Sequence, residues 1–437
     1  MNDQYAELYS SYQWFVPSQF NIAQACVHRW AHNTHEGRKI ALYVEDDLGQ
    51  REAWSYTRLA ETTNQLANGL IKMGINPGDR VAVLMGQRPE IVAAYMAVLS
   101  VNAVVMPLPA ALGAGQLAAR LRDAQARAAI VDTSAGPDVL QAQLAYPDLS
   151  QIIGLGFQHE NIIPWRTLLA RQPTEFKALV TTSSSPAFLL YNSGSHHPPC
   201  GALLAHGALI GNLPGFVSSQ NWFPQTSDVF WSPAPWTSHQ GLFNALLPCL
   251  YFGRPLVATL GQPSGGRALD ILQHYQVTNA FLPLEMLVRM QQAAAGHHDL
   301  ALKALALDTD ALDPSLLRYC QSSLQVTPNL VFGVPEANNI VGNSAQKWPA
   351  IPDSIGRPYP GHLVSVLDPQ GRPCPAGVVG QIAINRYDIQ GYADPALFLG
   401  YWNNPGATQA RYLGDWCLTG VSGSIDKEGY FRRIPGR

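Results

Sequence analysis

The sequence predicts an α/β fold with parallel sheets followed by a small β-rich part, and three observations support this. Short apolar runs alternate with segments of helical periodicity over most of the 437 residues, which is typical of parallel strands joined by crossover helices. Apolar residues make up 47% of the chain and charged residues only 14%, as expected when central strands are buried on both faces. Beyond Gly356 the apolar runs are short and separated by Gly and Pro turns, without a helical pattern.

The individual elements of the α/β part follow from apolar runs and helical spacing. Strands are expected at residues 40–44, 81–85, 103–106, 128–132, 187–191, 229–232, 256–259, 280–282, 304–307 and 331–332. Helices are expected at 20–30 (an amphipathic surface helix), from about 54–57 to Gly74, and at 89–100, 116–126 and 241–250.

The segments between these elements suggest how the chain is divided. Residues 153–180 are expected to form a connector with little regular structure, and the Ser/Thr run 181–185 a hinge. Three short strands are expected in the β-rich part, at 363–367, 380–384 and 430–434. The predicted limits are therefore 1–182 and 183–355 for two αβ subdomains and 356–437 for the β-rich subdomain.

Charge and cysteine content exclude several classes of function. The 28 basic and 31 acidic residues give a net charge of −3 without a basic run, so no nucleic acid or anionic membrane is expected as a partner. Six scattered cysteines without a CxxC pair indicate reduced thiols in a cytoplasmic protein, and the N-terminus lacks the pattern of a signal peptide. The uncharged segment 91–119 contains Pro107 and Pro109, which would break a membrane-spanning helix, so no span is expected.

The segment 187–206 (AFLLYNSGSHHPPCGALLAH) is the strongest candidate for a functional loop. A strand that leads into a Ser/Gly-rich loop is how α/β enzymes present backbone N–H groups to phosphate oxygens. The loop carries Ser193, Gly194, Ser195 and Gly201, but also two imidazoles and a thiol, from His196, His197 and Cys200. These last three could in principle hold a metal, yet their spacing is cramped, and a solvent-facing loop is the preferred interpretation.

Two other motifs are interpreted as structural. The GxGxxA pattern at residues 113–118 has no clean apolar strand running into it, so it is interpreted as a glycine-rich helix entry and not as a dinucleotide site. The pair His297 and His298 follows an alanine run and is interpreted as a helix terminus.

An ordered set of motifs resembles the large N-terminal domain of the adenylate-forming superfamily, in particular AMP-forming acyl-CoA synthetases of the medium-chain and benzoate-like type. YNSGSHHPPCGALLAH, at 191–206, is similar to the family loop YTSGTTGxPKGxxxxH, and FGVPE, at 332–336, is similar to YGxTE. Further similar segments are 81–107, 230–248, 354–358, 400–402 and 416–437, the last resembling WxxTGD…DxxGYxxxxGR. The resemblance implies two Rossmann-like αβ subdomains and a distorted β-barrel subdomain.

The resemblance also implies an activity and its partners. In this family a carboxylate attacks the α-phosphate of ATP to give an acyl-adenylate and pyrophosphate, and a thiol then takes the acyl group. The implied partners are ATP/AMP, Mg²⁺, a small carboxylic acid, and CoA or a carrier protein as the thiol; a homodimer is a further alternative. The family continues past the position of Arg437 into a small lid domain, which this chain is expected to lack.

Roles carried over from the family fall on the following residues. Ser195 and Glu336 are the expected catalytic residues, and Glu336 is also the expected Mg²⁺ ligand. The expected cofactor-binding residues are Ser193, Gly194, Gly201, Asp310, Phe332, Gly333 and Arg437. The expected acyl pocket is lined by Trp236, Thr237, His239 and Gly241.

Several nucleotide-binding positions depart from the family pattern. The second loop glycine becomes His197, the loop lysine becomes Cys200, and the GGE-like adenine segment reads Asp308-Thr309-Asp310. The threonine of YGxTE becomes Pro335, and the aspartate of TGD becomes Val421. Losing a charge-assisted contact or a ribose acceptor costs roughly 1–3 kcal/mol each.

These departures leave three hypotheses open. The first is a degenerate acyl-CoA synthetase-like protein that binds an acyl compound and adenylates weakly or not at all, because three such losses reduce turnover by roughly 10⁴-fold. The second is an active medium-chain or aryl acid–CoA ligase that uses compensating residues. The third is a non-catalytic interaction module, which a filled acyl pocket would favour.

Overall fold

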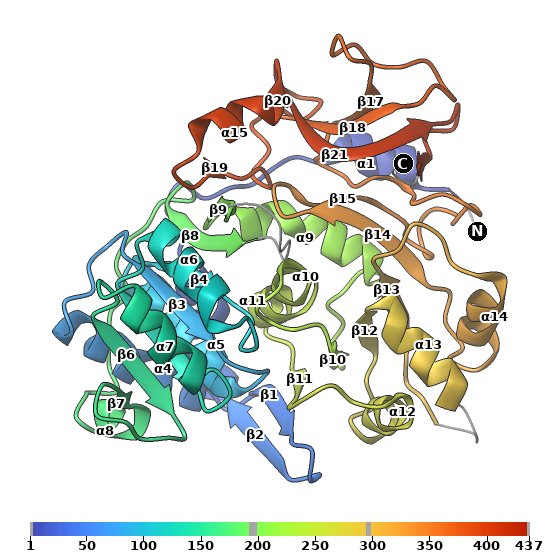
Figure 1. Ribbon diagram of the computed structural model, residues 1–437. Coiled ribbons are helices and arrows are strands. Elements are labelled where there is room, and N and C mark those ends of the chain that lie inside the picture. Colours follow the sequence, from blue (N-terminus) through green and yellow to red (C-terminus); the bar gives the residue numbers. More distant parts are fainter. Residues whose placement is uncertain (1–2, 192–198, 294–298, 435–437) are drawn as a thin grey trace.

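Two mixed sheets with parallel centres and one antiparallel sheet organise the molecule (Figure 1). The computed structural model describes residues 3–191, 199–293 and 299–434. The eight-stranded sheet lies on the left of Figure 1, the nine-stranded sheet on the lower right, and the antiparallel sheet at the top. The predicted α/β class with an added β-rich part is confirmed.

The eight-stranded sheet has the order β19-β9-β8-β4-β3-β5-β6-β7, in which β9 runs antiparallel to both of its neighbours, β8 and β19. The strands are β3 (Arg80–Leu84), β4 (Val104–Pro107), β5 (Ala128–Asp132), β6 (Gln151–Leu155), β7 (Ile163–Pro164), β8 (Pro186–Tyr191), β9 (Gly201–Ala205) and β19 (Gly400–Tyr401). One face packs against α4 (Tyr56–Lys72) and α5 (Pro89–Ser100), and the other against α6 (Ala114–Ala124) and α7 (Gly136–Ala145). The strands are almost wholly apolar because helices cover both faces.

The nine-stranded sheet has the order β16-β15-β14-β13-β12-β10-β11-β1-β2. Its strands are β1 (Ile40–Glu45), β2 (Arg51–Ser55), β10 (Phe230–Trp231), β11 (Leu256–Thr259), β12 (Asn279–Leu282), β13 (Ala304–Leu307), β14 (Asn329–Val334), β15 (Asn338–Gly342) and β16 (Arg357–Pro358). Its helices are α9 (Ala208–Ser219), α10 (His239–Gly241), the π-helical turn η2 (Leu242–Leu246), α11 (Leu247–Phe252), α12 (Gly265–His274), α13 (Leu284–Ala293) and α14 (Pro314–Ser322). The core residues of α12 to α14 form one apolar cluster with β12 and β13, so these three helices cover one face.

The two mixed sheets exchange segments across the predicted limit between residues 182 and 183. The early strands β1 and β2 belong to the nine-stranded sheet, where Leu42 pairs with Leu256 of β11. The later strands β8 and β9 belong to the eight-stranded sheet, where Phe188 pairs with Val105 of β4. The subdomain limits 1–182, 183–355 and 356–437 therefore stay a prediction. Each of the two mixed sheets contains strands from both sides of the limit between residues 182 and 183.

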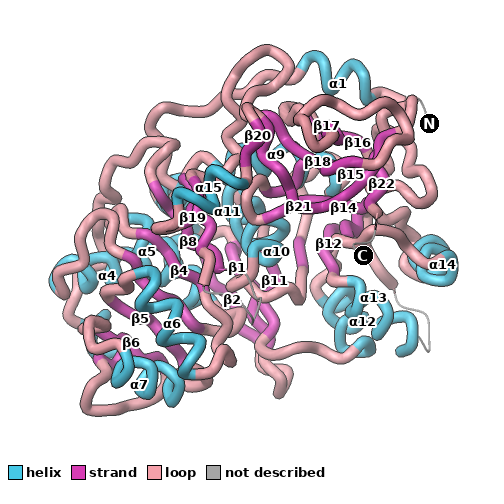
Figure 2. The backbone as a smooth tube through the Cα atoms, turned by 45° about the horizontal axis from the view of Figure 1, so that its top comes forward, coloured by secondary structure: helices cyan, strands magenta, loops and turns pink. Residues whose placement is uncertain are grey.

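The antiparallel sheet contains β17 (Val364–Leu367), β18 (Gly380–Asn385), β20 (Tyr412–Leu413), β21 (Trp416–Ile425) and β22 (Phe431–Arg433), beside the short helix α15 (Pro405–Ala410). The N-terminal helix α1 (Tyr5–Ser11) lies beside this sheet (Figure 2). Tyr5 donates a hydrogen bond to the carbonyl of Pro358 (2.9 Å) and Trp14 to that of Gly361 (3.0 Å), so the N-terminal segment is fixed to residues far along the chain.

Some element predictions are wrong. Residues 153–180 are not irregular throughout, because β6 ends there and β7 and α8 (Trp165–Ala170) follow. The β-rich part contains the helix α15, and its longest strand, β21, was not predicted. Segment 20–30 is not a surface helix: the π-helical turn η1 (Gln24–His28) buries four of its residues and continues into α2 (Arg29–Ala31), with α3 (Thr34–Gly37) after it.

The remaining outcomes concern the start of α4, the motif at 113–118 and the uncharged segment. Ser55 ends β2 and caps α4, since its hydroxyl accepts a hydrogen bond from the N–H of Arg58 (3.2 Å). Gly113 immediately precedes α6 with φ +81°, which confirms a glycine-rich helix entry. Within the described ranges, the helices are all too short or too polar to cross a membrane.

Candidate active site

The hairpin of β8 and β9 positions the two ends of the predicted phosphate loop. Tyr191 pairs with Gly201 in this antiparallel ladder. A side chain at Gly201 would displace the side chains of Leu189 and Tyr191, because a Cβ there would lie 2.7 Å from Leu189 Cδ1. The predicted residues Ser193, Gly194 and Ser195, together with His196, His197, His297, His298 and Arg437, lie outside the described residues.

A cavity of about 470 Å³ lies between the two mixed sheets, at the carboxyl ends of their strands. Three predicted residues line it, namely Thr237, His239 and Gly333. Apolar side chains from the loop after β4, such as Leu108 and Leu112, form another part of the wall. A crevice at the carboxyl ends of strands is where open α/β sheets bind their ligands.

His239 is held in one orientation by a short chain of hydrogen bonds. Its Nε2 lies 2.7 Å from Oδ1 of Asn338, while Nδ2 of Asn338 donates to the carbonyl of Ala208 (3.1 Å). Because Oδ1 can only accept, Nε2 of His239 carries the proton. Burial lowers the pKa of His239, so the neutral ring is favoured, and the ring stacks on Phe243 at 5.3 Å.

Trp236 and Gly241, also predicted for the acyl pocket, contact the core and do not line this cavity. The carbonyl of Trp236 accepts a hydrogen bond from Tyr95 (3.1 Å), and its side chain is 1% exposed. Gly241 packs so closely on the preceding loop that a Cβ would lie 2.0 Å from the carbonyl oxygen of Pro235. Both residues shape the segment that carries Thr237 and His239.

Glu336 is nearly buried and already has two partners. Its Oε1 accepts hydrogen bonds from the hydroxyl of Tyr401 and from Nη2 of Arg411 (3.1 Å). Arg411 also donates to the carbonyl of Thr419 (3.2 Å), and therefore joins the segment of Glu336 to the one that resembles TGD. The contacts of Tyr401 and Arg411 with Glu336 could not be predicted, because 65 and 75 residues separate them from Glu336 and their spacing follows no pattern.

Cys200, at the position of the family lysine, lies close to the same cluster. Burial raises the pKa of the Cys200 thiol, the carboxylates of Glu336 and Asp123 raise it further, and Arg411 opposes them. Asp123 accepts a hydrogen bond from the hydroxyl of Tyr191 (2.6 Å). The thiol is therefore neutral at pH 7 and supplies no charge for a phosphate.

The segments expected to bind adenine and ribose have partners within the chain. Asp310 forms an ion pair with Arg433 of β22, and the Arg433 guanidinium lies 5.2 Å from the centre of the Phe332 ring. Val421 is half-buried and supplies no acceptor side chain where the family has aspartate, while Thr419 donates to the carbonyl of Ile382 (2.7 Å).

The expected Mg²⁺ site depends on the carboxylate of Glu336. Among the described residues, no group of three or more His, Cys, Asp or Glu side chains could hold a metal ion. Mg²⁺, however, is commonly held by one or two carboxylates together with substrate phosphates. Glu336 fits this role through its second oxygen, Oε2, which has no hydrogen-bond partner in the described part of the chain.

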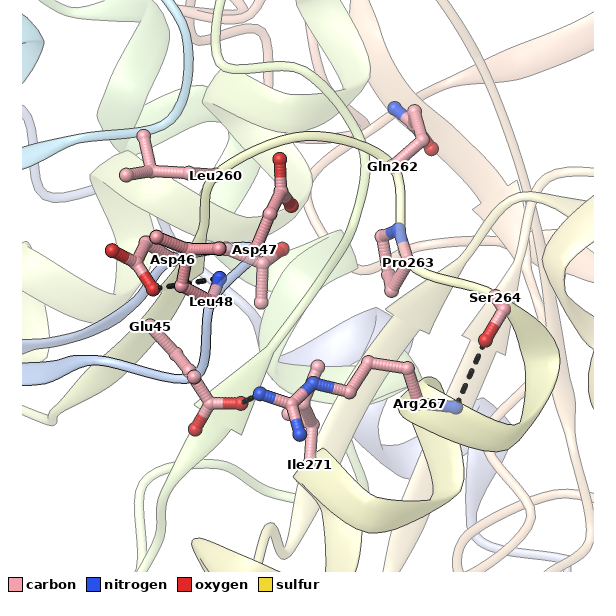
Figure 3. A pocket seen from close by; sticks show the side chains of 12 residues that line it. Glu45, Asp46, Asp47, Leu48, Leu260, Gln262, Pro263, Ser264, Arg267 and Ile271 are labelled. Carbon is pink, nitrogen blue, oxygen red and sulfur yellow. Dashed lines mark hydrogen bonds and ion pairs between the residues drawn. The ribbon is translucent and has the colours of Figure 1, made fainter.

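A second cavity, of about 400 Å³, lies beside the start of α12 and away from the predicted site residues (Figure 3). Arg267 points at Glu45, with which it forms an ion pair, and Glu45 also accepts hydrogen bonds from Arg51 (2.7 Å) and Tyr275 (3.0 Å). These contacts join β1 and β2 to α12. The charges of Glu45, Arg51 and Arg267 are therefore paired with one another within the fold.

Two mixed sheets that face each other across a cavity, with an antiparallel sheet beside them, are the arrangement that the resemblance to the adenylate-forming superfamily implies. The family model described as "AMP-binding enzyme" matches residues 27–402, and the chain belongs to this family, whose members include acyl-CoA synthetases. A relative from Bacillus subtilis (strain 168), "Uncharacterized acyl--CoA ligase YtcI", is 28% identical over 422 residues, covering 95% of this chain and 76% of that protein.

Other relatives agree with this assignment. The human "Acyl-coenzyme A synthetase ACSM5, mitochondrial" is 24% identical over 431 residues, covering 95% of this chain and 72% of that protein. The crystal structure of Brucella canis acyl-CoA synthetase covers 100% of this chain and 80% of its own, with a TM-score of 0.89 and 20% identity. An anthranilate CoA ligase, AuaEII, in complex with anthranoyl-AMP has a TM-score of 0.84 at 20% identity, covering 96% of this chain and 78% of its own. At these identities, the two structures show the fold alone.

Proposed function

We propose that this chain binds a small carboxylic acid and converts it slowly, with ATP, to the acyl-adenylate, as an AMP-forming acid–thiol ligase with a weakened nucleotide site. The observation that carries the proposal is the 470 Å³ cavity, which is open and is lined by Thr237, His239 and Gly333. An open cavity at this position also argues against a purely non-catalytic interaction module.

Different residues of the chain are proposed to bind the acid, Mg²⁺ and the phosphates. The cavity walls hold the acid, and neutral His239 offers its second ring nitrogen, Nδ1, as an acceptor. Glu336 is the proposed Mg²⁺ ligand through Oε2, and Ser193, Gly194, Ser195 and Gly201 are proposed to contact phosphate. Bound ATP would supply the electrophilic α-phosphorus. CoA or a carrier-protein thiol is the proposed acceptor, and a homodimer and a cytoplasmic location also remain predictions.

The proposed weakness of the nucleotide step has a structural rationale in three places. Cys200 is a neutral thiol close to two carboxylates, Val421 cannot accept a hydrogen bond from a ribose hydroxyl, and Arg433 lies over Phe332. Each lost contact to a charged or hydroxyl group costs roughly 1–3 kcal/mol.

The experiment measures acid binding and adenylation separately. Isothermal titration with a panel of fatty and aryl acids is expected to show binding without ATP, and acid-dependent pyrophosphate–ATP exchange is expected to be slow. Thr237→Trp should fill the cavity and abolish acid binding, whereas Thr174→Trp, at an exposed position, should not.

Two outcomes would change the proposal. Exchange at a rate typical of enzymes, on the order of 10 s⁻¹, would support the active-ligase alternative. Absence of binding for every acid would contradict the proposal and leave the interaction module.

A further inference from the structure

The acid-binding cavity contains a carboxyl group of its own. Asp308 follows β13 directly and lines the cavity together with His239 and Gln240. Its Oδ2 accepts a hydrogen bond from Nε2 of Gln240, which fixes the carboxyl group against the loop that carries His239. In the described residues, no hydrogen bond reaches the other oxygen, Oδ1.

Among the described residues, no cation forms an ion pair with Asp308. Burial raises the pKa of Asp308, Gln240 and Arg433 oppose this, and Asp310 adds to it. Arg433, the nearby cation, is already paired with Asp310. His239 is favoured in its neutral form. Arg120, a cation in the described lining of the cavity, lies on α6 with Gln116 as one of its partners at 3.2 Å.

A carboxyl group in a cavity that receives carboxylates has a clear electrostatic consequence. An ionised Asp308 repels the carboxylate of an acid that has a plain hydrocarbon chain, because both negative charges lie in one cavity. A ligand that brings its own hydrogen-bond donor, above all a positively charged amino group, offsets this repulsion by binding the free oxygen of Asp308.

We infer that Asp308, held by Gln240, recognises a hydrogen-bond donor on the substrate, so that the preferred acids carry an amino or hydroxyl substituent. This inference rests on the proposed function and specifies its substrate class. Asp308 is then a specificity-determining residue: it contacts the substituent and not the reacting carboxylate.

The test compares matched acids by isothermal titration in the absence of ATP. One series is benzoate with its ortho, meta and para amino and hydroxy derivatives, and the other is hexanoate with its terminal amino and hydroxy derivatives. The wild-type chain is expected to bind at least one donor-substituted acid about 10- to 100-fold more tightly than the parent acid. Comparison of amine with hydroxyl identifies which donor is preferred.

Variants separate recognition from folding. Asp308→Leu should remove the discrimination and bind the parent acids more tightly, and Asp308→Asn should reduce the preference for amines most. Asp270→Asn is the matched control, because Asp270 lies exposed on α12 and outside the cavity lining, and it should leave the preference unchanged. Thermal unfolding checks that each variant is folded.

The outcomes are distinguishable. Equal binding of parent and substituted acids by the wild-type chain, or discrimination that survives Asp308→Leu, overturns the inference and leaves the proposed function intact. Failure of every acid to bind overturns the proposed function as well.

Discussion

Glu336 and Arg411 form an ion pair of 3.1 Å between the end of β14 and the C-terminus of α15, although 75 residues separate them in sequence. The Glu336 side chain is 2% exposed, and that of Arg411 is 25% exposed. Together with Tyr401 and Thr419, this pair joins three segments that resemble the family, and two of them, 332–336 and 416–437, are expected at the nucleotide site. The site therefore holds a positive charge, supplied by Arg411 directly after α15.

Removing one partner of this pair should destabilise the fold measurably. Arg411→Gln leaves a nearly buried carboxylate with Tyr401 as its remaining partner, and we expect a loss of about 2 kcal/mol in the free energy of unfolding. Urea denaturation of Arg411→Gln, Glu336→Gln and the double variant should give a coupling energy of about 1–3 kcal/mol. Arg386→Gln, which removes an arginine stacked on Tyr412 at 3.9 Å, is the control and should cost less than about 1 kcal/mol. Additive single effects would contradict the coupling.

Restoring the charge in the loop should strengthen ATP binding. In Cys200→Lys a cation replaces the neutral thiol, and we expect the dissociation constant for ATP to fall by about 10-fold or more. Val421→Asp should add a comparable gain through the ribose, and the double variant should show faster pyrophosphate exchange. The matched control is Cys200→Met, which changes volume without charge. If Cys200→Lys and Cys200→Met change the dissociation constant for ATP equally, the missing positive charge is not the cause of weak ATP binding.

The segment that carries His239 depends on Gly241. A Cβ at Gly241 would lie 2.0 Å from the carbonyl oxygen of Pro235, so Gly241→Ala must displace the backbone. We expect a loss of about 3 kcal/mol or more in unfolding free energy and loss of acid binding. Gly266→Ala in α12 is the control, since nothing lies within 4 Å of the added Cβ, and it should stabilise the protein by up to about 1 kcal/mol. Thermal and urea unfolding of both variants test this.

Buried His206 should make the protein sensitive to acid. Burial lowers its pKa to about 3, while its ring accepts a hydrogen bond from the N–H of Ile22 (3.1 Å). Below pH 6.5 the unfolded chain binds a proton that the native state does not bind until about pH 3. The stability contribution is therefore present above pH 6.5 and is lost at about 1.4 kcal/mol per pH unit as the pH falls.

The variant His206→Asn keeps an acceptor for Ile22 and removes the titrating ring. Urea unfolding at several pH values should show a slope reduced by about one proton between roughly pH 4 and 6. Above pH 7 the difference in stability between variant and wild type should be constant. An unchanged slope would show that His206 does not titrate on unfolding.

Local patterns predicted the central strands of the two mixed sheets, because these are short apolar runs buried on both faces. The failures have physical reasons. The helix α15 buries none of its residues, so its sequence carries no amphipathic period. Strand β21 contains Gly420 and Gly423 and mixes exposed with buried positions, which hides its alternation. The helix α8 has six residues, too few to show two helical turns.

The candidate site was predictable only where a motif is contiguous. Thr237, His239, Gly333 and Glu336 belong to two short motifs, and the structure places the first three around one cavity. Tyr401 and Gln240 lie in segments that resemble the family, but the sequence does not show which side chains they contact, and Arg411 lies outside those segments. The contacts of all three depend on the packing of separate sheets. The cavity role of Asp308 could not be inferred without knowing that Gln240 lies opposite.

The crossing of strands between the two mixed sheets also affects how the protein is made. Strand β1 leaves the ribosome early, yet its parallel neighbour β11 is synthesised more than 200 residues later. At 5–20 residues per second, the β1–β2 hairpin waits roughly 10–40 s with an unpaired edge. During this interval the nascent chain exposes the unpaired backbone groups of β1, which could pair with another chain, and we expect chaperones to bind this edge.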